Sequence, residues 1–107
     1  MSGISFVGVD VPGFFGDPDD ELYVLFYQLG MTLPFFRAHG HVKSYAREPY
    51  LQTLEVLNLA RDAIKFRYSL IHYLYTAFER ASNDGIPIMR PLWMDFPDDP
   101  LATNIEN

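Results

Sequence analysis

Two short extended segments, each followed by a helical pattern, constrain the fold of this chain most. Residues 4–11 are small or β-branched as far as Asp10 and predict one strand, which Pro12 and Gly13 end. Residues 32–41 predict a second strand. The order strand, helix, strand, helix is typical of a βαβα unit in a parallel sheet. Because two strands cannot bury a parallel sheet on both faces, we expect the chain to be part of something larger.

Both helical patterns carry start and stop signals. Asp17 is the expected cap of the first helix, Pro18 occupies its first turn, and it should end before Pro34. Its expected apolar face consists of Leu22, Leu25, Phe26 and Leu29. The second pattern runs without proline or glycine over residues 53–82, with Gly85 as the stop. Its expected apolar face consists of Val56, Leu57, Ala60, Ala63, Ile64, Ile71, Leu74, Tyr75 and Phe78.

The remaining residues predict little regular structure. Residues 86–96 should be extended, and their two prolines make them unfit for a central strand. Residues 97–107 are polar and are expected to be loose.

Composition excludes several classes of protein. The 107 residues carry a formal net charge of −6, and the eight Lys and Arg residues are scattered, which argues against nucleic acid binding. The absence of cysteine excludes a disulfide framework and a thiolate zinc site. No apolar run approaches the roughly 20 residues that span a membrane, so no membrane partner is expected. Aromatic residues make up 16%, which suits a large core or a pocket for sugar faces.

Polar side chains stand where both predicted strands end. Asp10 closes the first strand, and Arg37, His39 and His41 alternate along the second, so they point the same way. Sites in α/β folds form at the carboxyl ends of strands. The structural alternative is an Arg37–Asp10 ion pair beside two histidines whose hydrogen bonds are satisfied within the fold. The two histidines are too few for a zinc site, so we expect no metal and no cofactor.

A series of sequence blocks carries a family resemblance. These blocks are Gly8–Gly16 (GVDVPGFFG), Pro34–His41 (PFFRAHGH), Arg47–Tyr50 (REPY), Arg67–Leu70 (RYSL) and Gly85–Trp93 (GIPIMRPLW). In order and spacing they resemble the catalytic barrel of glycoside hydrolase family 31. The resemblance implies an α/β fold in which residues 1–85 are the C-terminal part of a (β/α)8 TIM barrel, from strand seven to helix eight. Residues 86–107 would then begin the following β-sandwich domain, and the isolated chain would be helix-dominated.

The resemblance also implies an activity and roles for four residues. The family contains retaining α-glucosidases, which hydrolyse terminal α-linked glucose from oligosaccharides or N-glycans. Asp10 and His39 match residues that bind glucose hydroxyls, Phe14 matches an aromatic wall of the pocket, and Arg37 would orient His39 and nearby acids. His41 would support the site. The blocks that hold the family's nucleophile and acid/base are absent, so no catalytic residue is expected in this chain, which would be inactive alone.

The resemblance is strongest to the glucosidase II-like branch of the family. That branch implies a lectin-like beta subunit as partner and the lumen of the endoplasmic reticulum as location, although the chain itself carries no targeting signal. Two other interpretations stay open. One is a non-catalytic, truncated structural or interaction piece, and the other is a different specificity in the family, such as an alpha-xylosidase or a maltase.

Overall fold

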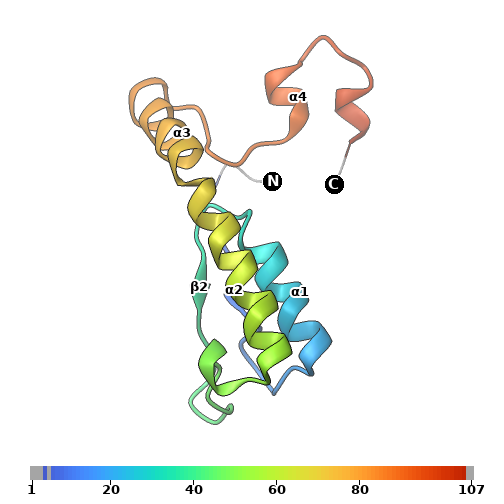
Figure 1. Ribbon diagram of the computed structural model, residues 1–107. Coiled ribbons are helices and arrows are strands. Elements are labelled where there is room, and N and C mark those ends of the chain that lie inside the picture. The colour runs from blue at the N-terminus through green and yellow to red at the C-terminus, as the bar shows by residue number, and fades with distance from the viewer. Residues whose placement is uncertain (1–3, 5, 106–107) are drawn as a thin grey trace.

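The computed structural model describes residue 4 and residues 6–105, and most of its regular structure is helical (Figure 1). The elements in chain order are β1 (Asp10–Val11), α1 (Asp20–Gly30), β2 (Arg37–Ala38), the 3-10 turn η1 (Pro49–Leu51), α2 (Leu54–Ser69), α3 (Ile71–Asp84), α4 (Leu92–Asp95) and the 3-10 turn η2 (Ala102–Asn104). The expected order of strand, helix, strand and helix is confirmed, and so is the dominance of helix.

The two strands pair in parallel, as the order of elements predicts. Asp10 lies opposite Arg37, and Val11 lies opposite Ala38. Two further main-chain hydrogen bonds of 3.0 Å continue the pairing, from the Phe35 N–H to the Val7 oxygen and from the His39 N–H to the Val11 oxygen. The parallel register brings the carboxyl ends of β1 and β2 to one edge, where the two following loops meet.

Both strands are shorter than predicted. The expected ranges 4–11 and 32–41 contain only two strand residues each, and Ser5 lies outside the described residues. Residues 32 and 33 instead complete the end of α1, because the Thr32 and Leu33 N–H groups donate to carbonyls of its last turn. Pro12 ends β1 because it has no N–H for a ladder.

Helix α1 begins two residues later than the sequence indicates. Asp19, not Asp17, is the cap: its carboxylate accepts a hydrogen bond of 2.9 Å from the Leu22 N–H. The prediction for Asp17 is wrong because a different part of the chain uses that carboxylate, which accepts from the Tyr45 N–H at 2.8 Å. The tertiary contact with residue 45 replaces the local cap.

The core lies between α1, α2 and β1. It contains Val11, Tyr23, Tyr27, Val56, Ala60 and Ala63, all buried. The predicted face of α1 is wrong in part: Phe26 packs against this core, but Leu22, Leu25 and Leu29 are exposed. The buried face of α1 consists instead of residues 23, 27 and 30, which have the same helical spacing shifted by one position. The two tyrosines can be buried because their hydroxyls form hydrogen bonds.

The predicted helix over residues 53–82 is two helices. Thr53 caps α2 as predicted, since its hydroxyl accepts from the Val56 N–H at 3.4 Å. The interruption lies at Leu70, between α2 and α3. The Ser69 hydroxyl donates to the Phe66 carbonyl at 2.7 Å, and the Leu70 N–H is shared between the Phe66 and Arg67 carbonyls. This competition for one carbonyl disturbs the regular bonding of the helix.

Helix α3 leaves the α1–α2 pair (Figure 1), and it contacts Phe6 in the chain before β1. The Phe78 ring lies edge-on to the Phe6 ring, with centroids 5.3 Å apart. Gly85 ends α3 in the left-handed conformation, as predicted. Of the apolar face predicted for this part of the helix, Leu74 is buried, but Ile71, Tyr75 and Phe78 are exposed.

The C-terminal residues are more regular than predicted. Residues 86–96 contain the four-residue helix α4, which Pro91 precedes. The Arg90 guanidinium holds this turn by donating to the Asp95 carboxylate at 2.7 and 2.9 Å. Residues 97–107, which were expected to be loose, include the 3-10 turn η2, in which Ala102 is buried. Short-range polar contacts of this kind leave no apolar periodicity in the sequence.

Candidate functional site

The paired strands β1 and β2 carry a charged pair one residue before their carboxyl ends. The Arg37 guanidinium donates to the Asp10 carboxylate across the parallel strands, with side-chain exposures of 49% and 25%. Arg37 also lies over the Phe35 ring, 5.3 Å from its centroid. The ion pair expected from the sequence is therefore confirmed. Because it is accessible, its charges and remaining lone pairs can meet a polar ligand.

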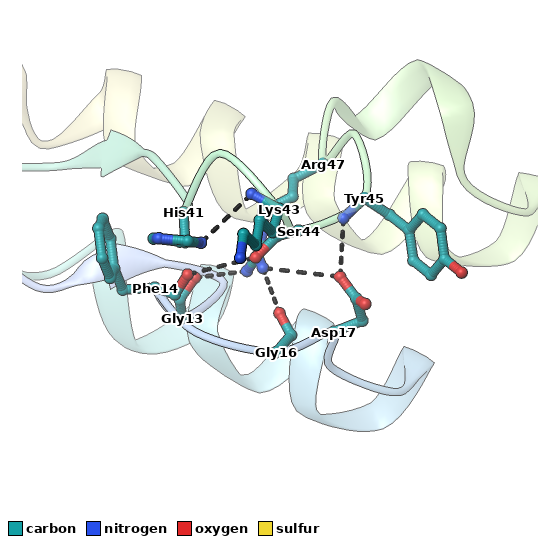
Figure 2. A network of polar contacts seen from close by, with 9 residues as sticks. All are labelled: Gly13, Phe14, Gly16, Asp17, His41, Lys43, Ser44, Tyr45 and Arg47. Carbon is teal, nitrogen blue, oxygen red and sulfur yellow. Dashed lines mark hydrogen bonds and ion pairs between the residues drawn. The ribbon is translucent and has the colours of Figure 1, made fainter.

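Aromatic and histidine rings gather beside this pair. The Phe14 ring lies 5.7 Å from the His39 ring and 5.8 Å from the His41 ring, measured between centroids. The main chain fixes this group, since the His41 N–H donates to the Phe14 carbonyl at 2.8 Å. His41 Nδ1 accepts from the Lys43 N–H at 3.2 Å (Figure 2). The structure thus brings Phe14 and His39 together from two loops.

An open hollow of about 300 Å³ follows the loop after β2. It is lined by residues 38–41 and 45–49, which include His39, His41 and Arg47. The orienting role predicted for Arg37 on His39 has no direct contact behind it in the described structure, since Arg37 bonds to Asp10 instead. That role, and the sugar contacts of all four predicted residues, stay predictions.

Arg47 is a residue of the site to which the sequence assigns no role. Its side chain is only 9% exposed, and its guanidinium donates to the Gly13 and Gly16 carbonyls (Figure 2). Its own carbonyl accepts a 2.7 Å hydrogen bond from the Tyr23 hydroxyl. The only sequence signal was its place in the REPY block, because main-chain acceptors leave no pattern of residue types.

Burial controls the ionisation of the tyrosines beneath the site. Loss of solvent raises the pKa of the Tyr23 hydroxyl far above its ordinary value, and its hydrogen bond with Tyr27 raises that pKa further. Burial also raises the pKa of Tyr27. Both hydroxyls therefore remain neutral hydrogen-bonding groups across the physiological pH range.

Within residue 4 and residues 6–105, no group of three or more His, Cys, Asp or Glu side chains is arranged to hold a metal ion. No helix in the described part of the chain has the length and apolar character to cross a membrane.

The sequence over residues 1–77 matches the glycosyl hydrolases family 31 TIM-barrel domain. The chain belongs to glycosyl hydrolase family 31. A probable glucan 1,3-alpha-glucosidase of Oryza sativa subsp. japonica is 50% identical over 104 residues, which cover 97% of this chain and 11% of that protein. Neutral alpha-glucosidase AB of Mus musculus is 47% identical over all 107 residues, again 11% of that protein. This family 31 chain spans about 11% of the length of these relatives.

Solved structures of the same family share the fold. A glucosidase II alpha subunit in its Glc1Man2-bound form matches with a TM-score of 0.89 and 42% identity, over 97% of this chain and 11% of that one. A heterodimeric complex of endoplasmic-reticulum glucosidase II, formed by the catalytic subunit and the binding domain of the regulatory subunit, matches with a TM-score of 0.83 and 43% identity, over 90% of this chain and 10% of that one. The predicted family and its glucosidase II-like branch are confirmed.

Proposed function

We propose that this chain is the part of an α-glucosidase catalytic barrel that runs from strand seven to helix eight. In this proposal β1 and β2 are the last two barrel strands, and α2 and α3 together form the helix that closes the barrel. The parallel pairing of β1 with β2 and the helix α1 between them support this placement. Residues 86–107 would begin the domain that follows the barrel.

The observation that carries the proposed activity is the register of Asp10 opposite Arg37, one residue before the carboxyl ends of the parallel strands. Active sites of such barrels lie at that end. Phe14 and His39 come from the loops directly beyond it, with their rings 5.7 Å apart. A carboxylate and an imidazole beside an aromatic ring suit a sugar, since they bind hydroxyls while the ring covers an apolar sugar face.

In the proposed mechanism the chain holds the terminal glucose while other residues of the barrel act on it. Retaining hydrolysis needs two carboxylates about 5–5.5 Å apart, one as nucleophile and one as acid/base. We assign neither role to a residue of this chain. Asp10 and His39 would bind hydroxyls of the glucose ring, and Phe14 would limit its tilt. Arg37 would hold the Asp10 carboxylate in place through their ion pair. Such positioning lowers the barrier by restricting the ring before attack.

The names of the similar proteins support a more specific substrate and setting. One solved relative is a glucosidase II alpha subunit in a Glc1Man2-bound form, and another is a heterodimer with a regulatory subunit. We therefore include in the proposal an N-glycan substrate with terminal α-linked glucose, a lectin-like beta subunit as partner, and the lumen of the endoplasmic reticulum as location.

The proposal is tested with His39→Ala in the natural polypeptide that carries this segment. Removing a hydrogen bond to a substrate hydroxyl should lower kcat/KM on maltose by about 10- to 100-fold, equivalent to 1–3 kcal/mol. His72→Ala is the matched control, because His72 is an exposed histidine on α3. It should leave kcat/KM within about twofold of the wild type.

The alternatives give different results. A loss below about twofold for His39→Ala removes the sugar-binding role. Equal activity of the wild-type protein on an α-xyloside and on maltose would favour another specificity within the family. Absence of any glycosidase activity, together with a failure to bind glucose, would favour a structural or interaction piece.

A further inference from the structure

We propose that Arg47 is a positioning residue that sets the distance between Phe14 and His39. This inference rests on the proposed function, because these two side chains are the proposed walls of the glucose site. Arg47 itself contacts no sugar in the proposal. It acts by joining the turn that carries Phe14 to the loop that carries His39.

The first step of the argument is the bond between Arg47 and the turn before α1. The guanidinium donates from one nitrogen to the Gly13 carbonyl and from another to the Gly16 carbonyl (Figure 2). These two carbonyls flank Phe14 and Phe15 in the sequence. The same side chain lies 3.8 Å from the Asp17 carboxylate. Hydrogen bonds from a charged donor are stronger than neutral ones, so this contact adds to the main-chain bond from His41 to Phe14 in fixing the turn.

The second step is the contact between Arg47 and the loop after β2. Gly40 stands between His39 and His41, and a Cβ atom placed on it would lie 2.5 Å from Arg47 Nε. The loop can therefore pass over the guanidinium only because residue 40 has no side chain. Arg47 thus touches the Phe14 turn on one side and the histidine loop on the other.

The third step is that Arg47 is itself immobile. Its side chain is 91% buried, since only 9% is exposed, and its carbonyl accepts from the buried Tyr23 hydroxyl at 2.7 Å. This bond connects Arg47 to the core under α1. A lysine here would keep the charge but not the planar fork that reaches two carbonyls at once. The turn would then lose one of its two fixed points.

Arg67 offers a matched control in the same chain. Its guanidinium also binds main-chain oxygens, with bonds to the Met31, Leu33 and Pro34 carbonyls in the segment that follows α1. It does not line the hollow beside His39. Arg67→Lys therefore removes a comparable set of bonds at a distance from the proposed site.

The experiment compares Arg47→Lys and Arg67→Lys in the natural polypeptide. For Arg47→Lys we expect KM for maltose and Ki for glucose to rise about tenfold. We also expect kcat to fall, because the glucose ring is held less well for attack. For Arg67→Lys we expect a lower Tm with unchanged KM and Ki. Gly40→Ala keeps the arginine but displaces it, and should raise KM as Arg47→Lys does.

Two results would overturn the inference. One is a lower Tm with unchanged KM and Ki in both Arg47→Lys and Gly40→Ala, which is the pattern of a purely structural residue. The other is an unchanged chemical shift of the His39 Hε1 proton, which senses the neighbouring Phe14 ring, in Arg47→Lys. The inference predicts that this shift changes in Arg47→Lys and stays the same in Arg67→Lys. If the wild-type protein neither hydrolyses glucosides nor binds glucose, the proposed function fails, and this shift alone decides the role of Arg47.

Discussion

Tyr23 is the residue through which the core supports the site. Its ring stacks on Tyr27 with centroids 5.0 Å apart, and its hydroxyl donates to the Arg47 carbonyl at 2.7 Å. Burial is the main reason that the pKa of this hydroxyl is raised, and the hydrogen bond with Tyr27 is the second. A neutral, buried donor therefore carries the link between α1 and the loop after β2.

The raised pKa of Tyr23 predicts a stability change at alkaline pH. An unfolded tyrosine ionises near pH 10, whereas folded Tyr23 keeps its proton to higher pH. Tyr23 therefore stabilises the folded state fully below about pH 10. This stabilisation is lost as the pH rises through the folded pKa, because only the unfolded state loses the proton. We expect Tm of the wild-type polypeptide to fall more steeply above pH 10 than that of Tyr23→Phe. At neutral pH the variant should lose about 1 kcal/mol with the hydrogen bond. Parallel Tm curves above pH 10 would contradict this explanation.

The sequence predicts single residues unequally well. Asp10 and His39 could be selected because polar residues at the ends of apolar strands stand out against their neighbours. Arg47 could not be given a role, since its partners are the carbonyls of Gly13 and Gly16 and every residue has a carbonyl. The cap at Asp19 was misassigned to Asp17 because both carboxylates precede the helix and only the tertiary contact with Tyr45 separates them.

At the scale of elements, the interruption at Leu70 shows where periodicity stops being informative. The apolar spacing continues through this position without proline or glycine, so one helix was predicted. The hydroxyl of Ser69 takes the Phe66 carbonyl, and the chain turns into α3. A serine in a helical pattern is common, and its side-chain bond is not visible in the sequence.

The end of α3 gives a prediction about one glycine. Gly85 has a φ of 72°, which an alanine adopts only with strain, so Gly85→Ala should destabilise the last turn of α3 by about 1 kcal/mol. Hydrogen exchange of the amides in residues 80–85 should accelerate about fivefold. Ser82→Ala, an exposed substitution inside the same helix, is the control and should leave the exchange nearly unchanged. Equal rates for both variants would show that the cap is unimportant.

At the scale of the whole molecule, apolar side chains lie open on several elements. Leu22, Leu25 and Leu29 are exposed on α1, and Ile71 and Tyr75 are exposed on α3. Both stripes have the spacing of buried helix faces, which is why the sequence predicted them as core. Large exposed apolar surfaces mark places where another surface packs. They agree with the proposal that further barrel elements cover these helices.

This exposure predicts the behaviour of the 107 residues alone. We expect the purified 107-residue chain to show helical circular dichroism with a broad, non-cooperative thermal transition, because the core formed by the described residues includes a single strand residue, Val11. We also expect no hydrolysis of maltose above a buffer blank. A sharp, cooperative transition would contradict the partial-domain proposal, and hydrolysis would show that the chain holds a complete catalytic set.

The two arginines hold the segments that enter and leave α1, and both do so through main-chain oxygens. Arg47 binds the turn before the helix, and Arg67 binds residues 31–34 after it. The acceptors of Arg47, Gly13 and Gly16, have φ angles of 112° and 68°, which other residues adopt only with strain, but Phe15 between them contributes no atom to these bonds. Replacement of Phe15, whose ring lies beside Phe14 and His41, can therefore alter the chemistry around the site while the backbone path stays the same. The fold would thus separate the residues that fix shape from those that selection can vary for a new substrate.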